Sequence, residues 1–341
     1  MINTVYRLVS AKTFDVSYNE VDLEESELIV RPTYLSICKA DQRYYQGDRD
    51  PQILAEKLPM ALIHEGIGKV VHDSSGKFEV GDIVVMIPNT PVEYDNIVAE
   101  NYLKSSRFKS SGFDGFLQEY VTTTSDRALK IDNDINPYLA AFTELISICI
   151  HSIDRMDKFA HEKRNTIGVW GDGNVGFITS LLFKELFPET EVVVLGRNHE
   201  KLSHFTFADK VMLINEVPNE FEVDHAFECV GGMNSQTAIE QIIKYINPQG
   251  TISLLGVSEY PISINTRMIL EKGISLFGSS RSGKKDFERV LDIFKKHESI
   301  IPYLENLIVE TVRIRNIDDI KDAFEKDIVI DFGKVIMIWD K

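Results

Sequence analysis

The sequence predicts an α/β protein in which a doubly wound parallel sheet is inserted in a β-rich domain. Between residues 145 and 280, apolar strand-like runs alternate with helical patterns, which is typical of an open parallel sheet. Six strands are expected there, at 167–170, 192–195, 211–214, 225–228, 251–255 and 274–278. Short β-type runs separated by turns fill residues 1–140, and a further apolar run lies near the end of the sequence.

The segments on either side of the parallel sheet are expected to form one domain. Before residue 140, β-type runs include 28–32, 68–71 and 82–88, whereas the polar stretch 89–115 predicts an extended lobe or a mobile loop. After residue 281, an amphipathic helix at 286–296 precedes a strand-like run at 333–339. A completed six-stranded sheet has no place for that strand, so we expect it to return to the first domain. The predicted boundaries are therefore 1–146, 147–280 and 281–341.

The first strand of the parallel sheet leads into a glycine-rich turn and then a helix. The turn and first helical positions are Gly171, Asp172, Gly173, Asn174, Val175 and Gly176. In such a fingerprint Gly171 takes the tight turn, Gly173 lets the backbone approach a pyrophosphate, and Gly176 lets the helix pack closely on the strand. The phosphates lie at the helix N-terminus. Strand, turn and helix together predict dinucleotide binding.

The end of the next strand indicates which dinucleotide is bound. NAD-binding proteins carry an acid about 20 residues after the fingerprint, where it accepts a hydrogen bond from the ribose 2′-hydroxyl. Here Gly196 and Arg197 occupy that position. An arginine holds a 2′-phosphate through paired charged hydrogen bonds, and Lys201 just beyond is expected to contribute, so NADPH is predicted. The alternative is that Arg197 points into solvent or stacks on the adenine.

Composition limits the possible partners and compartments. The 341 residues are 43% hydrophobic and 26% charged, as in a globular protein with sizeable cores. The net charge of −16 argues against nucleic acid and anionic membranes, and no stretch predicts a membrane span or a targeting segment. A cytoplasmic enzyme is therefore expected. Three scattered cysteines are too few for a disulfide framework or a four-cysteine structural zinc lobe.

A second constellation consists of Cys38, His64, Glu65 and Glu144. Thiolate, imidazole and carboxylate are the ligands of a catalytic zinc ion, whose remaining position stays open to water or a carbonyl oxygen. Each residue alone has an ordinary explanation: a small buried cysteine, a surface His-Glu pair, and a glutamate that begins a helix. Direct and water-mediated ligation by the two glutamates stay open.

Taken together, these motifs resemble the medium-chain, zinc-dependent alcohol and polyol dehydrogenases, and the resemblance runs from residue 1 to about 339. The segments 37–41, 63–66 and 143–147 resemble that family's zinc motifs in order. The resemblance implies a GroES-like catalytic domain built from both chain ends around a Rossmann domain, with one catalytic zinc per chain. It also implies that Asp41 hydrogen-bonds the far nitrogen of His64.

Further segments resemble one branch of the family, the bacterial ribulose-5-phosphate reductases. They are 41–45, 170–176, 226–232 and 278–283. The resemblance implies reduction of D-ribulose 5-phosphate by NADPH at zinc, with the product ribitol 5-phosphate used for CDP-ribitol, teichoic acid or capsule synthesis. It implies substrate contacts by Arg43, Tyr44 and Arg281, and cofactor contacts by Val230 and Gly231. A homodimer, and a complex with a cytidylyltransferase, are further expectations.

Some positions depart from the family pattern, and other functions stay open. Ala40 occupies the position of the usual proton-relay Ser or Thr, so the relay would fall to zinc-bound water, Glu65 or Tyr44. Arg43 and Arg281 could instead be surface charges paired with Asp41 or Asp286.

One alternative function is a zinc polyol or alcohol dehydrogenase that oxidises an unphosphorylated substrate. Another is a non-catalytic module that retains the fold.

Overall fold

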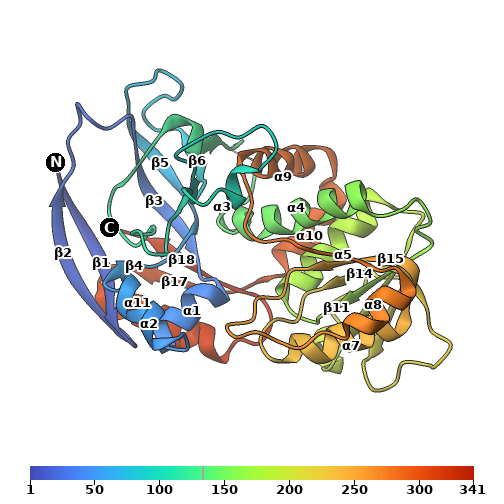
Figure 1. The fold of residues 1–341 in the computed structure, drawn as a ribbon. Helices are drawn as coiled ribbons and strands as arrows, with labels where there is room; N and C mark the ends of the chain where they lie inside the picture. Colours follow the sequence, from blue (N-terminus) through green and yellow to red (C-terminus); the bar gives the residue numbers. More distant parts are fainter. Residues whose placement is uncertain (133) are drawn as a thin grey trace. The chain divides into compact units, whose positions relative to one another are not determined.

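The computed structural model describes residues 1–132 and 134–341, which form two compact units. The first comprises Met1–Ser147 together with Arg281–Lys341, and the second comprises Ile148–Ser280. Both consist of mixed helices and strands (Figure 1). Each unit has its own buried apolar core.

The strands of the first unit form two main sheets and a small hairpin-like pair. They are β1 (Ile2–Ser10), β2 (Thr13–Glu20), β3 (Leu28–Ser36), β4 (Met60–Ala61), β5 (Glu65–Asp73), β6 (Ile83–Met86), β7 (Asn89–Thr90), β8 (Arg107–Phe108), β9 (Val121–Thr123), β10 (Ala128–Lys130), β17 (Ile308–Ile314) and β18 (Lys334–Trp339). The larger sheet has the order β10-β6-β5-β3-β18-β17, with β9 also paired to β3. The smaller sheet has the order β2-β1-β4, and β7 pairs with β8.

The C-terminal strand β18 joins the first unit, as the sequence predicts. It pairs antiparallel with β3, so that Ile336 lies opposite Ser36, and parallel with β17. Five of its six residues are buried, and the odd one, Ile338, is partly buried. This apolar strand therefore joins β17 to strands that precede it by more than 200 residues in the sequence.

The helices of the first unit come from both of its chain segments. They are α1 (Lys39–Gln46), α2 (Pro51–Lys57), α3 (Pro137–Ala140), α9 (Lys284–Lys296), α10 (Ile301–Glu305) and α11 (Ile317–Val329). Short 3-10 turns occupy Glu100–Tyr102, Ser125–Arg127 and Glu298–Ile300. The stretch 89–115 is more ordered than its polar composition suggests, because β7 and β8 pair and Phe108 is buried.

The second unit is a six-stranded parallel sheet in the order β13-β12-β11-β14-β15-β16. Its strands are β11 (Thr166–Trp170), β12 (Glu191–Gly196), β13 (Lys210–Leu213), β14 (Val223–Glu228), β15 (Ile246–Leu254) and β16 (Ser275–Gly278). Its helices are α5 (Asn174–Leu186), α6 (His199–Leu202), α7 (Asn234–Tyr245) and α8 (Thr266–Lys272), and α4 (Thr143–Phe159) begins in the first unit. Helices α5 and α7 cover opposite faces of the sheet (Figure 1). This is the predicted doubly wound order, with the reversal next to β11.

Candidate active site

Cys38, His64 and Glu65 converge in the first unit. One potential ligand atom from each lies within 4.8 Å of the other two, and no other group of this kind occurs among residues 1–132 and 134–341. Cys38 directly precedes α1, His64 directly precedes β5, and Glu65 is the first residue of β5. The sheet brings them together because β3, which leads to Cys38, pairs with β5 so that Ser36 lies opposite Glu65.

Asp41 orients the imidazole of His64. An oxygen of its fully buried carboxylate lies 3.3 Å from Nδ1 of His64. The same carboxylate accepts hydrogen bonds from the hydroxyl of Ser110 at 2.6 Å and from the backbone N–H of Ile63 at 3.1 Å. Because Nδ1 is engaged, Nε2 is the nitrogen left to bind a metal ion. Burial lowers the pKa of His64, but Asp41 and Cys38 outweigh it and raise that pKa well above its ordinary value.

Lys334 forms a buried ion pair with Glu65 that the sequence did not lead us to expect. Its Nζ lies 2.8 Å from a carboxylate oxygen of Glu65 and also donates to the backbone oxygen of Ile37 at 2.8 Å. The two side chains are 3% and 0% exposed. Burial lowers the pKa of Lys334, but the charges of Glu65 and Cys38 reverse the effect and raise it. The one indication of this ion pair in the sequence is a lysine as the first residue of an otherwise apolar strand.

Glu144 lies in the first turn of α4, close to but outside the tight group. It is 1% exposed, and its Oε2 is buried without a hydrogen-bond partner among the described residues. Burial, with the negative charges of Glu65 and Asp41, raises the pKa of Glu144 to about 7, although His64 and Lys334 oppose the shift. A buried carboxylate oxygen without a partner is costly unless a cation binds it. The residues present therefore fit a zinc ion.

Arg281 lies beside this group in a conformation that non-glycine residues rarely adopt, with φ of 58°. Its guanidinium carbon is 4.4 Å from the ring centre of Phe108, and that ring is centred 5.4 Å from the ring of His64. Burial lowers the pKa of Arg281, and the charges of Glu144 and Tyr44 oppose the shift. The hydroxyl of the next residue, Ser282, lies 2.7 Å from that of Ser147, which holds this loop on α4.

Tyr44 is buried on α1 between two cations. Its hydroxyl accepts a hydrogen bond from Nζ of Lys57 at 3.1 Å, and the guanidinium of Arg49 lies 4.3 Å from its ring centre. Arg43, the preceding residue of α1, is half-buried. Sequence reasoning did not find Lys57, because α2 carries no motif around it.

The glycine-rich turn of the second unit joins β11 to α5. Gly171 has φ of 136°, and a Cβ at Gly176 would lie 1.9 Å from the carbonyl oxygen of Gly171. A Cβ at Gly173 would meet nothing within 4 Å, so the backbone there is open to a ligand. Asn174 and Val175 are the first two residues of α5, whose N-terminus faces the turn. This geometry suits a bound pyrophosphate.

The end of β12 lies next to the same turn. The carboxylate of Asp172 accepts hydrogen bonds from the backbone N–H groups of Arg197 at 2.7 Å and Asn198 at 2.9 Å. The side chain of Arg197 is exposed and forms no ion pair among the described residues. Gly196 is the last residue of β12, and Lys201 lies on the short helix α6.

Val230 and Gly231 follow β14. Both backbone N–H groups donate to one carboxylate oxygen of Glu228, at 2.9 and 3.1 Å. A contact between these two residues and a cofactor would therefore involve carbonyl oxygens or packing.

Comparison with known proteins identifies the family. The Alcohol dehydrogenase GroES-like domain pattern matches residues 24–133, and the Zinc-binding dehydrogenase pattern matches residues 191–296. A Ribulose-5-phosphate reductase of Bacillus spizizenii is 52% identical over 340 residues, which cover 100% of both chains. The chain belongs to the ribulose-5-phosphate reductase group of zinc-binding dehydrogenases. The predicted resemblance and fold class are thus confirmed.

Other relatives support this membership. Ribulose-5-phosphate reductase 1 of Staphylococcus aureus is 51% identical over 339 residues, or 99% of both chains. The crystal structure of S. aureus TarJ in complex with NADPH aligns over 100% of both chains with a TM-score of 0.90 and 46% identity.

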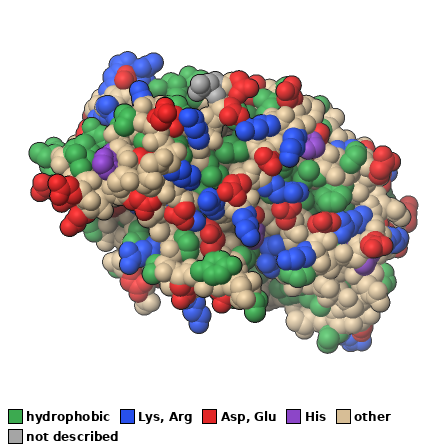
Figure 2. Space-filling model, turned by 90° about the horizontal axis from the view of Figure 1, so that it is seen from above, with side chains coloured by type: hydrophobic (Ala, Val, Ile, Leu, Met, Phe, Trp, Pro, Cys, Tyr) green, Lys and Arg blue, Asp and Glu red, His purple; other side chains and the backbone are tan. Residues whose placement is uncertain are grey.

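In the view of Figure 2, basic and acidic side chains are interspersed over the visible face. Within the described part of the chain, no helix combines the length and apolar character needed to cross a membrane.

Proposed function

We propose that this protein reduces D-ribulose 5-phosphate to D-ribitol 5-phosphate with NADPH at a catalytic zinc ion. Support comes from relatives that carry this function in their names and match the whole chain at about half identity. The observation that carries the proposal in this chain is the cationic surrounding of Tyr44 and Phe108 beside a zinc-type donor set. An anionic substrate is the class of ligand that such a site favours.

The donor set would hold zinc through Cys38, His64 and a carboxylate. Glu144 has a buried carboxylate oxygen without a hydrogen-bond partner, and Glu65, which belongs to the tight donor group, is ion-paired with Lys334 through one of its two oxygens. When bound, zinc would polarise the ketone oxygen as a Lewis acid. Asp41 keeps the imidazole of His64 in the orientation that presents Nε2.

We assign the cofactor site to the β11–α5 turn and the end of β12. NADPH would supply the hydride, which is the general role of nicotinamide cofactors in oxidoreductases. Arg197 would bind the 2′-phosphate, because no carboxylate stands at the end of β12 and its own side chain is exposed. The S. aureus TarJ structure with NADPH supports this assignment at 46% identity.

We assign the phosphate of the substrate to Arg281 and Lys57. No carboxylate forms an ion pair with either side chain among the described residues: Arg281 stacks on Phe108, and Lys57 donates to the hydroxyls of Tyr44 and Ser111. Lys39, by contrast, is already paired with Asp327 at 3.1 Å. Arg281 and Lys57 are therefore the cations left to bind an anion near the metal group.

The product would feed a cytidylyl transfer that makes CDP-ribitol for teichoic acid or capsule. NADPH and pentulose phosphates are cytoplasmic metabolites, so we place the reaction in the cytoplasm. We further propose a homodimer and a complex with the cytidylyltransferase. Light scattering after size-exclusion chromatography, with and without that enzyme, tests both.

A phosphate-selection experiment tests the proposed substrate. We compare kcat/KM for D-ribulose 5-phosphate and unphosphorylated D-ribulose in wild type, Arg281→Ala and Lys57→Met. Each variant should lose about 10- to 100-fold on the phosphorylated substrate and change little on ribulose, since a charged hydrogen bond contributes about 1.5–3 kcal/mol. Lys285→Met, an exposed lysine near Arg281, is the matched control. Equal losses on both substrates would instead favour a dehydrogenase for an unphosphorylated polyol or alcohol.

A further inference from the structure

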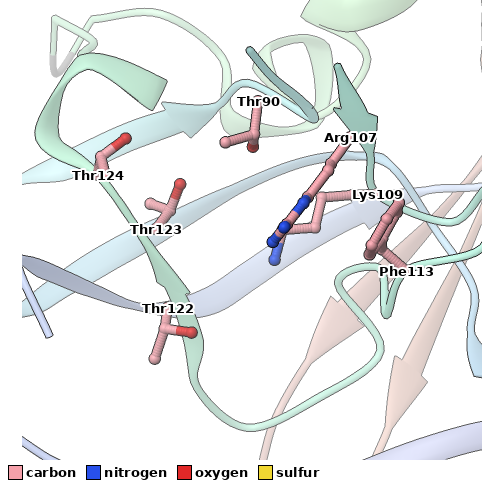
Figure 3. Close-up of a pocket in the computed structure, with 7 residues that line it drawn as sticks. All are labelled: Thr90, Arg107, Lys109, Phe113, Thr122, Thr123 and Thr124. Carbon is pink, nitrogen blue, oxygen red and sulfur yellow. The ribbon is translucent and has the colours of Figure 1, made fainter. Parts of the chain in front are cut away.

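A cavity of about 190 Å³ lies between the β7–β8 lobe and β9 in the first unit. This is several times the roughly 30 Å³ that a water molecule occupies in the liquid. Figure 3 shows Arg107 and Lys109 extending from one side of the cavity toward Thr122 and Thr123 on the other. The cavity is therefore lined by two cationic side chains and by hydroxyl groups.

Neither cation in this cavity has an acidic partner among the described residues. Arg107 is held with its guanidinium 5.6 Å from the ring centre of Phe113. Burial lowers the pKa of Lys109, and Asp114 is the one acid that opposes the shift. The carboxylate of Asp114 already has other partners: it forms an ion pair with Arg7 at 2.6 Å and accepts a hydrogen bond from the backbone N–H of Ala61 at 2.9 Å.

The hydroxyl groups of the cavity complete a set of donors. Those of Thr90, Thr122 and Thr123 make no hydrogen bond among the described residues. The hydroxyl of Thr124 donates to Asp126 at 2.5 Å, and Asp126 is itself paired with Arg127 at 2.7 Å. Two uncompensated cations and three free hydroxyls are the donors that a phosphate oxyanion requires.

The cavity is separate from the catalytic group. Successive side chains of an extended strand point to opposite faces. Phe108, between the two cations, packs against His64 and beneath Arg281. Arg107 and Lys109 therefore face away from the proposed substrate site, and one strand of the lobe separates the two positions.

We propose that this cavity, the lobe anion pocket, is a second binding site for a phosphate oxyanion, independent of the phosphate of the substrate. The bound group is either inorganic phosphate or the phosphate of a small metabolite, and both present the same oxygens to Arg107 and Lys109. Because Phe108 joins the pocket to His64, a bound anion also stabilises the lobe segment that packs on the metal group.

Equilibrium dialysis with radiolabelled inorganic phosphate tests the pocket, on the zinc-loaded full chain that is saturated with NADPH and carries Arg281→Ala/Lys57→Met to remove both proposed ligands of the substrate phosphate. One phosphate should still bind per chain. Adding Arg107→Ala and Lys109→Met should weaken its binding at least about tenfold, whereas Lys104→Met, an exposed lysine of the same lobe, should leave it unchanged. Competition with glycerol 3-phosphate distinguishes the sources: stronger competition than by unlabelled phosphate identifies a metabolite, and weaker competition identifies free phosphate.

Two controls keep the result decisive. In phosphate-free buffer, Arg107→Ala/Lys109→Met should keep wild-type reductase activity, which shows that the chain is folded. Thr123→Val, which removes one hydroxyl at nearly constant shape, should weaken phosphate binding severalfold. Unchanged phosphate affinity in the Arg107→Ala/Lys109→Met background, or a loss of equal size in Lys104→Met, overturns the proposal.

Discussion

Replacement of Lys334 by Met should strongly destabilise the zinc-free protein. The change keeps much of the side-chain volume but removes the charge 2.8 Å from Glu65, in a place where the two side chains are 3% and 0% exposed. Breaking a buried ion pair from one side leaves an uncompensated charge, at a cost of about 3–5 kcal/mol. The bond from Lys334 to the carbonyl oxygen of Ile37 is lost as well. We therefore expect the free energy of unfolding to fall by about 3–5 kcal/mol.

Urea unfolding of the zinc-free variants at neutral pH measures this loss. Lys326→Met breaks an exposed ion pair with Glu310 and should cost less than about 1 kcal/mol, so it is the matched control. Lys334→Met/Glu65→Gln should recover part of the stability, because no unpaired carboxylate is left. Zinc should also stabilise Lys334→Met more than wild type, since the metal can take the place of the ammonium. If Lys334→Met is as stable as Lys326→Met, the buried ion pair does not contribute the stability assigned to it.

Three further predictions concern the metal, the cofactor and pH. Elemental analysis should find about one zinc per chain, and two would contradict the single donor group among the described residues. Cys38→Ser should lose the zinc and the activity but keep the circular dichroism spectrum of the folded protein. Arg197→Ala should weaken NADPH binding about 10- to 100-fold and leave NADH binding nearly unchanged, as read by fluorescence titration. Burial, with the neighbouring His161, lowers the pKa of His225 from 6.5 to about 4. Between these two pH values His225 is therefore protonated in the unfolded state and neutral in the folded state. Stability should thus fall by up to about 3 kcal/mol as pH drops from 6.5 to 4, and thermal melting should show a shallower decline in His225→Gln.

The fold and the cofactor turn could be predicted because their signals are local. The six parallel strands appear as short apolar runs, and the roles of Gly173 and Gly176 follow from spacing alone. The return of β18 could be predicted because a buried strand must pair, and the parallel sheet was already complete.

The missed residues act through partners that are distant in sequence. Lys334 meets Glu65 only because β18 pairs with β3, and Ser110 reaches Asp41 only through the folded lobe. Packing also restricts design at the cofactor site. The missing acid at the end of β12 suggests Gly196→Asp as a switch toward NADH, but a Cβ there would lie 2.6 Å from that of Asp172. An added carboxylate would also repel the one already present.

The most direct test of the proposed reductase activity is the reaction itself, run with purified zinc-loaded protein, NADPH and D-ribulose 5-phosphate. Absorbance follows the consumption of NADPH, and mass spectrometry with a chiral standard identifies the product. We expect one D-ribitol 5-phosphate to form per NADPH consumed, with much slower turnover of unphosphorylated ribulose and of NADH. Consumption of NADPH at equal rates with ribulose and ribulose 5-phosphate, or no turnover of either ketose, would contradict it.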